Sequence, residues 1–107
     1  MNTTNYPTAQ LAEIVNRIVR VAQPEKIILF GSAARGKVER DSDYDLLVIK
    51  TCPNRRKLTD LIYRSLIGVG HAVDIVVATP EDVKKYGDNP VLILEPALRE
   101  GIILYAA

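Results

Sequence analysis

Three short apolar stretches, bounded by turn-forming residues, alternate with segments of helical periodicity along this chain. They cover residues 26–30, 43–49 and 72–78 and are rich in Ile, Leu and Val, as buried strands are. The segments between them repeat apolar residues three and four apart, as amphipathic helices do. This alternation predicts a small mixed sheet flanked by helices, an α/β (α+β) domain.

The expected order is helix, strand, helix, strand, helix, strand, helix. Two of these helices have a clear apolar face, formed by Leu11, Ile14, Val15, Ile18 and Val19 in the first and by Leu58, Leu61, Ile62, Leu66 and Val69 in the longer second one. Shorter helices are predicted at 33–35, from the Thr79 cap onward, and over 91–100 despite Pro96. Residues 102–105 are expected to form an edge strand.

Length and composition narrow the class of protein. A chain of 107 residues fits one domain, which we expect over 1–107, and 48% hydrophobic residues exclude a disordered chain. No apolar run is long enough to span a bilayer, and residues 1–10 do not resemble a secretion signal, so a cytoplasmic location is expected. A net charge of +1 gives no bulk signal for direct nucleic-acid binding.

Three aspartates occupy positions that buried strands normally avoid. Asp43 and Asp45 are two residues apart in one apolar stretch, so a strand would direct both side chains to the same face. Asp74 interrupts another apolar stretch. If these two strands are neighbours, three carboxylates meet at one point, where their repulsion calls for hard cations such as Mg²⁺ or Mn²⁺.

A Gly-Ser pair follows the first apolar stretch. Gly31 allows a phosphate to approach the backbone closely, and Ser32 adds a hydroxyl donor at the start of a short helix. The pair matches neither the P-loop nor the dinucleotide-binding fingerprint, and alone it is an ordinary turn signal. Beside metal-binding carboxylates it predicts a phosphate cradle.

Other polar residues have two interpretations each. Arg35 either reaches a phosphate or lies paired or solvated on the surface. The basic run 55–57 is either a solvated helix face or the surface for an acidic or RNA-associated partner. His71, the one histidine, is expected to be structural, and the one cysteine, Cys52, to be inert.

Gly31-Ser32, ten residues, then Asp43-Tyr44-Asp45 form the pattern G-S-x(10)-D-x-D. This pattern, with Asp74 inside the stretch 73–76, resembles the polymerase-beta-like nucleotidyltransferases, and among them the minimal nucleotidyltransferases of toxin–antitoxin modules. The resemblance extends over nearly the whole chain, and no motif position departs from it.

The resemblance implies a site and a reaction. Asp43 and Asp45 would hold two Mg²⁺ ions on ATP or another nucleoside triphosphate, and Asp74 would bind the catalytic ion and help to activate the acceptor hydroxyl. Gly31 and Ser32 would hold the β- and γ-phosphates, with Arg35 as a further contact. The product would be a nucleotidylated acceptor and pyrophosphate.

The resemblance also implies a partner, a helical HEPN ribonuclease toxin whose tyrosine would receive AMP from this antitoxin. Two alternatives remain open, a non-catalytic antitoxin that acts by complex formation and an antibiotic-type enzyme with a small-molecule acceptor and a second subunit. We expect no membrane contact. A homodimer or hetero-oligomer, the base preference and the acceptor are not determined by the sequence.

Overall fold

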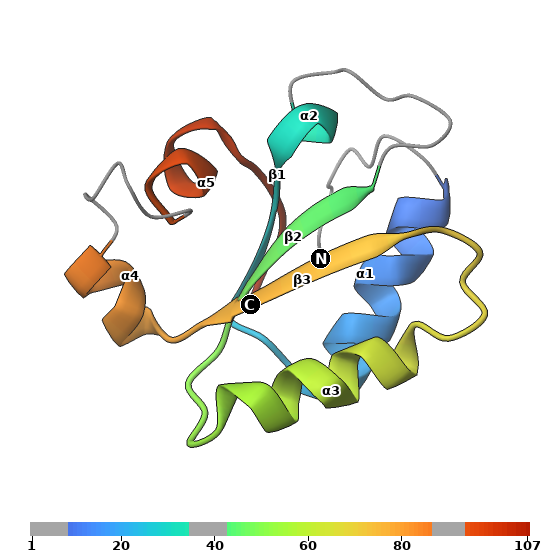
Figure 1. Ribbon diagram of the computed structural model, residues 1–107, viewed down its shortest axis with the longest axis horizontal. Coiled ribbons are helices and arrows are strands. Elements are labelled where there is room, and N and C mark those ends of the chain that lie inside the picture. The colour runs from blue at the N-terminus through green and yellow to red at the C-terminus, as the bar shows by residue number, and fades with distance from the viewer. Residues whose placement is uncertain (1–8, 35–42, 87–93) are drawn as a thin grey trace.

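A four-stranded sheet with helices on both faces forms the centre of the computed structural model, which describes residues 9–34, 43–86 and 94–107 (Figure 1). The elements are α1 (Ala9–Ala22), β1 (Lys26–Phe30), α2 (Gly31–Ala34), β2 (Tyr44–Ile49), α3 (Arg55–Ser65), β3 (Val73–Ala78), α4 (Pro80–Tyr86), α5 (Leu94–Glu100) and β4 (Ile102–Ala106). The predicted mixed α/β class is confirmed. No helix in the described ranges is long and apolar enough to cross a membrane.

The strands lie in the order β3-β2-β1-β4. Strand β1 runs antiparallel to β2 and to β4, whereas β2 and β3 are parallel. Parallel neighbours need a crossover, and α3 provides it. The predicted edge strand is confirmed as β4, which extends one residue further than expected and shifts register opposite Ile27 and Ile28.

Helix α1 follows its predicted apolar face closely. Leu11, Ile14 and Ile18 are fully buried against the sheet. The helix ends at Ala22, after which Gln23 adopts a left-handed backbone conformation (φ 47°) and donates its N–H to the Val19 carbonyl. Pro24 follows and cannot continue the helix, so the predicted end of this element is confirmed.

Helix α3 begins with Asn54, whose side chain accepts a hydrogen bond of 3.1 Å from the Lys57 N–H. Ile62 is fully buried, but Leu61 is 44% exposed, so the prediction that Leu61 belongs to the buried face was wrong. Successive helical residues are about 100° apart, and the side of α3 that meets the sheet and α1 takes Ile62 and leaves Leu61 outside.

Polar side chains fasten α1 to the segment after α3. Arg17 Nη1 donates hydrogen bonds to the carbonyls of Ser65 (3.2 Å) and Ile67 (3.0 Å). Gln10 Nε2 donates to the Val69 carbonyl at 3.1 Å. These carbonyls lie beyond the last full turn of α3, where intrahelical donors run out, so α1 satisfies them from outside.

The outer edge of β3 also receives a side chain from α3. The Ile75 N–H donates a hydrogen bond of 2.9 Å to the Tyr63 hydroxyl oxygen. Among the described strands β3 is the last on its side of the sheet, so none of them lies beyond it to accept from this N–H. Tyr63 therefore occupies part of the exposed edge of the sheet.

The sheet has a different core on each face. The larger one lies between the sheet and α1 with α3, and its fully buried strand residues are Ile27, Leu29, Leu46, Val48 and Leu104. The smaller one lies under α5 and α4 and consists of Ile28, Phe30, Leu47, Ile49, Ala78 and Ala97. Figure 1 shows α1 and α3 on one side of the strands and α4 with α5 on the other.

The start of α4 forms as its sequence predicts. Asp82 N–H donates to Thr79 Oγ1 at 3.1 Å, and Thr79 N–H donates to Asp82 Oδ2 at 3.0 Å. This reciprocal pair is a capping box, with Pro80 at the first helical position. Arg55 of α3 adds an ion pair of 2.7 Å to the same Asp82 oxygen.

Some element boundaries differ from the expected ones. The short helix begins at Gly31 rather than at residue 33, and strands β2 and β3 each begin one residue late, at Tyr44 and Val73. The last helix begins at Leu94, so Pro96 lies in the first turn, where its missing N–H breaks no intrahelical bond. Pro7, the expected loop 37–42, the turn at 87–90 and residues 91–93 lie outside the described residues.

Candidate active site

Asp45 and Asp74 stand directly opposite each other in the parallel pairing of β2 with β3. The expectation that these two strands are neighbours is confirmed. The alternating pattern assigns Tyr44, Leu46 and Val48 to the core under α1 and α3, and so turns Asp45 to the other face of the sheet. The two carboxylates thus lie on the face that carries α4 and α5.

Asp43 is positioned differently from the prediction. It precedes the first residue of β2 and is exposed, so it is not a strand residue sharing the pleat with Asp45. Its charge nevertheless acts on Asp45. The structure brings the three acids into one neighbourhood, with Asp45 and Asp74 as a pair and Asp43 beside them.

The pKa of Asp45 is raised above its ordinary value. Burial is the largest cause, followed by the negative charges of Asp74 and Asp43 and by a side-chain hydrogen bond with Asp74. Each of these disfavours the ionised form of Asp45. A neighbouring cation would therefore stabilise the ionised form of Asp45 more than it would stabilise a carboxylate pair that is fully solvated.

Gly31 makes room for the Asp45 carboxyl group. Its φ of 76° is in the left-handed region, which side chains with a Cβ rarely adopt. A Cβ added there would overlap Asp45 Oδ2 and lie 3.2 Å from Asp45 Cγ. Phe30, the preceding residue, pairs with Asp45 across β1 and β2, which explains the close approach.

The structure describes less of the other two predicted phosphate contacts, Ser32 and Arg35. Ser32 lies in α2, one residue after Gly31, and its backbone belongs to the described helix. Arg35 lies outside the described residues. The geometry shows that Gly31 packs closely against Asp45, and the phosphate roles of Gly31, Ser32 and Arg35 stay predictions.

An aromatic contact beside the acids was not expected from the sequence. Tyr44, which separates Asp43 from Asp45, is 2% exposed and stacks on His71 with ring centroids 4.4 Å apart. His71 precedes β3, so the stack joins the starts of the two acid-bearing strands. The signal was present in the sequence as an aromatic residue between two acids, but its partner 27 positions away could not be identified.

The donor chemistry of this site suits a hard divalent cation. Carboxylate oxygens are the ligands that Mg²⁺ and Mn²⁺ prefer, and burial, followed by the charges of Asp74 and Asp43, raises the pKa of Asp45, which a cation nearby would counteract. Among the described residues, however, no three His, Cys, Asp or Glu side chains are already arranged to hold an ion.

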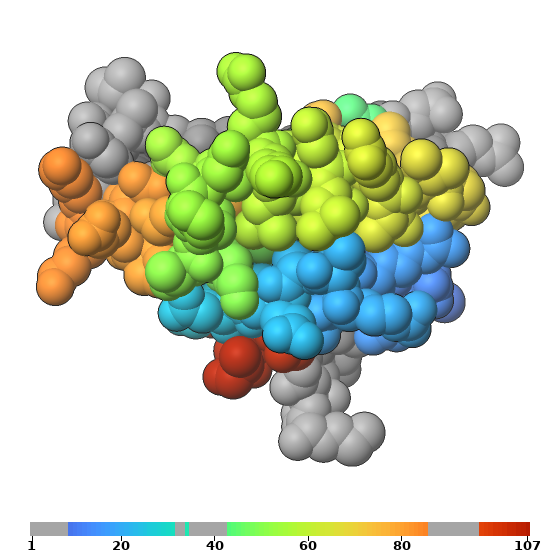
Figure 2. Space-filling view, turned by 90° about the horizontal axis from the view of Figure 1, so that it is seen from below, coloured from blue at the N-terminus to red at the C-terminus, as the bar shows by residue number. Residues whose placement is uncertain are grey.

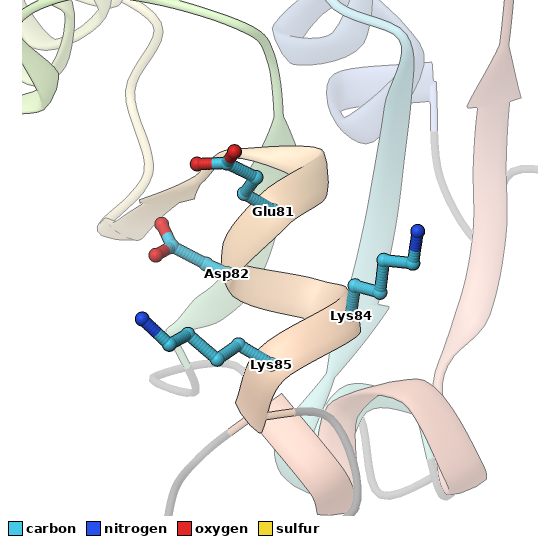
Figure 3. A pocket seen from close by; sticks show the side chains of 4 residues that line it. All are labelled: Glu81, Asp82, Lys84 and Lys85. Carbon is cyan, nitrogen blue, oxygen red and sulfur yellow. The ribbon is translucent and has the colours of Figure 1, made fainter.

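A hollow of about 380 Å³ lies elsewhere, beside α4, and is lined by Glu81, Asp82, Lys84 and Lys85. Figure 3 shows Lys84 projecting from the opposite side of the helix from Asp82 and Lys85. The lining charges are of both signs, and Asp82 is engaged by Thr79 and Arg55. This hollow therefore offers a ligand no concentrated charge, unlike the acid pair.

The sequence and the fold both have counterparts among known proteins. A family model described as "Nucleotidyltransferase domain" matches residues 9–103. The chain belongs to this family. The resemblance noted from the G-S-x(10)-D-x-D pattern is thus confirmed, and the fold is that of a nucleotidyltransferase domain.

Individual relatives agree with the family. A Methanocaldococcus jannaschii protein, provisionally named protein adenylyltransferase MJ1305, is 38% identical over 72 residues, which are 62% of this chain and 49% of the relative. The chain therefore spans about half the length of that curated relative.

Solved structures are similar as well. One provisionally named a minimal nucleotidyltransferase is 30% identical, with a TM-score of 0.59 and 88% of each chain covered. A toxin–antitoxin structure with AMP-PNP is 20% identical, with a TM-score of 0.60 and 94% of this chain and 75% of that chain covered. The second likeness shows the shared nucleotidyltransferase fold.

Proposed function

We propose that this nucleotidyltransferase domain transfers a nucleoside monophosphate, AMP from ATP, to a hydroxyl group of a partner protein. The observation that carries the proposal is the direct opposition of Asp45 and Asp74 beside a glycine that leaves room for Asp45. Family membership supports the reaction class, and AMP-PNP in a structural neighbour supports a nucleotide as the ligand.

Asp43, Asp45 and Asp74 would hold the metal in this proposal. Two Mg²⁺ ions, or Mn²⁺ in their place, would neutralise the triphosphate and stabilise the attacking and leaving oxygens. Gly31 and Ser32 would receive the β- and γ-phosphates at the end of β1, with Arg35 as a further contact. The left-handed backbone of Gly31 supports this role, since it exposes backbone close to Asp45.

The proposed reaction is an in-line displacement at the α-phosphorus. The acceptor oxygen forms a bond to this phosphorus while the bond to the oxygen bridging to the β-phosphate breaks, and pyrophosphate leaves. The acceptor proton passes to a base. Asp74 is proposed to orient the acceptor hydroxyl and take that proton, because it is more exposed than Asp45 and belongs to the outermost strand.

The proposed acceptor is a tyrosine of a helical HEPN-type ribonuclease toxin, with this chain as the antitoxin. Two likenesses support this, one to the M. jannaschii relative named as a protein adenylyltransferase and one to the toxin–antitoxin structure with AMP-PNP. We further propose one domain over 1–107, a homodimer or a hetero-oligomer with the partner, a cytoplasmic location and no direct nucleic-acid contact.

The test is transfer of label from ATP labelled at the α-phosphate, with MgCl₂ and a lysate of the source cells. Asp45→Asn and Asp74→Asn should each lower labelling of a protein band by about a hundredfold or more. Glu81→Gln, which removes an exposed acid of α4, is the control and should label normally. Wild-type labelling by Asp45→Asn would contradict the site.

The same experiment separates the alternatives. A stable complex with a co-purifying protein, and no label from any of the four nucleoside triphosphates, would assign the chain to binding alone. Label in a small product rather than a protein band would indicate an antibiotic-type acceptor. A readout independent of activity is thermal stability, which MgCl₂ should raise for the wild type more than for Asp45→Asn.

A further inference from the structure

The two helices on the face opposite the acid pair carry most of the excess positive charge of the molecule. Helices α1 and α3 contain six basic residues (Arg17, Arg20, Arg55, Arg56, Lys57 and Arg64) and two acidic ones (Glu13 and Asp60). The whole chain has a net charge of only +1, so the remainder of the sequence is acidic overall. Figure 2 shows α1 and α3 side by side on one surface.

A hollow of about 560 Å³ lies along one side of α3 on this surface. It is lined by Cys52, Pro53, Asn54, Lys57, Leu58, Asp60, Leu61 and Arg64. Its apolar part is formed by Leu58 and Cys52, both half-buried, and by Leu61, which is 44% exposed although it is a leucine. Cys52 and Leu58 also pack against the larger core, so Leu61 is the member of this apolar strip that is most open to solvent.

Two cations border the strip. Lys57 and Arg64 are seven residues apart, with Leu61 between them, so they flank it over two helical turns or about 10 Å. Within the described residues neither of them forms an ion pair, nor does Asp60. Arg55, by contrast, is paired with Asp82, and Arg17 is held by Glu13.

We propose that this groove along α3 is a docking site for an acidic amphipathic helix of a partner protein. An apolar strip with a cation near each end is complementary to a helix that presents a large apolar residue flanked by Asp or Glu about two turns apart. A nucleic acid fits less well, because Asp60 lies in the rim and the strip offers apolar side chains rather than a continuous row of cations.

The position of the groove has a consequence for the site of catalysis. Helix α3 packs on the face of the sheet opposite Asp45 and Asp74, so a helix bound here leaves the acid pair accessible. Docking and group transfer are therefore separable, and this inference does not depend on the proposed reaction.

The probe is a synthetic amphipathic peptide with a stripe of Leu and Phe flanked by Glu. Its binding is measured from the ¹H–¹⁵N chemical shifts of the full chain. The reference probes are the same peptide with Lys in place of Glu, and a ten-residue uridine oligonucleotide. The acidic peptide should perturb Lys57, Leu61 and Arg64, and its affinity should fall as NaCl is raised.

Variants localise the binding. Lys57→Glu with Arg64→Glu should weaken the acidic peptide by roughly tenfold or more, and Leu61→Ala by a smaller factor. Lys26→Glu with Lys84→Glu, an equal charge change at two exposed lysines outside the groove, is the control and should bind normally. The charge variants change only exposed side chains, so the fold is expected to persist.

Several outcomes would overturn the proposal. One is equal binding of the acidic and basic peptides, or shifts confined to other elements. Another is tighter binding of the oligonucleotide at the same residues, which would assign the face to RNA. A third is self-association of the unliganded chain that Leu61→Ala abolishes, which would make the groove a contact between copies of this chain.

Discussion

The two faces of the sheet carry different kinds of side chain, although the same strands form both. Under α1 and α3, every inward strand residue from Tyr44 to Val48 is apolar and at most 2% exposed. On the other face the same strands carry Leu47 and Ile49 at one end and Asp45 at the other, with Asp74 beside it. On one face these strand residues are all buried and apolar. On the other face buried apolar side chains give way to carboxylates within three residues.

This difference indicates which part of the molecule stabilises the fold against the repulsion between the clustered carboxylates. Ionised carboxylates held together disfavour folding, as the raised pKa of Asp45 indicates. The apolar contacts of the opposite face provide the stability that offsets this repulsion. Substitutions on the two faces should therefore have unequal effects on folding.

The largest difference is expected between a fully buried leucine of the larger core and a partly buried leucine beside the smaller one. Leu46 is fully buried under α1 and α3, and Leu46→Ala should lower the free energy of unfolding by about 3–4 kcal/mol. Leu98 of α5 is only partly buried against the smaller core, and Leu98→Ala should cost about 1 kcal/mol. Urea denaturation measures both, and equal losses would contradict the proposed inequality.

The next largest effect concerns Gly31. Gly31→Ala adds a Cβ that overlaps Asp45 Oδ2 and strains the backbone, so we expect a loss of about 2 kcal/mol together with loss of nucleotidyl transfer. Gly68→Ala is the control. Gly68 has a similar φ of 85° but nothing within 4 Å of its added Cβ, so this variant should lose only about 1 kcal/mol and retain activity.

A smaller effect is expected for Asp82, which holds α4 by capping rather than by core packing. Hydrogen bonds from the Thr79 backbone and side chain, and the charge of Arg55, lower the pKa of Asp82. Asp82→Ala should cost about 1 kcal/mol at pH 7. A lowered pKa contributes stability above the unfolded value near pH 4, so the difference from wild type should shrink as pH falls through the lowered folded pKa.

The smallest effect has the opposite sign. Asp45→Asn removes a repelled carboxylate and should raise the free energy of unfolding at pH 7 without divalent ions, by less than about 1 kcal/mol because the group is partly exposed. A raised pKa disfavours the folded state above that pKa. The advantage of the variant should therefore fade as pH drops through the raised folded pKa toward about 4, and denaturation at pH 7 and pH 4 checks it.

Much of this architecture could be predicted because local patterns specify it. The face of α1, strand β1 and the start of α4 all follow from periodicity and capping residues that act within one element. The candidate acids were also visible, since Asp45 and Asp74 each interrupt an apolar stretch. Their meeting depends on the pairing of β2 with β3, which no local pattern determines.

The failures arise where tertiary contacts decide. Leu61 fits the periodicity of a buried face, but the position of α3 on the sheet favours Ile62 instead. Asp43 fits a strand, yet the pairing of β2 begins only at Tyr44. The stacking of Tyr44 on His71 joins segments that the sequence separates, so neither residue indicated the other.

The hydrogen bond between Tyr63 and Ile75 affects how copies of this chain could associate through the edge of the sheet. An outer strand with open N–H groups is a template on which another chain can add a strand. The Tyr63 hydroxyl occupies one such N–H on β3, next to the acid-bearing position, so an incoming strand would first have to displace a side chain anchored on α3. Addition of a further strand past β3 is thereby obstructed by a single side chain of α3.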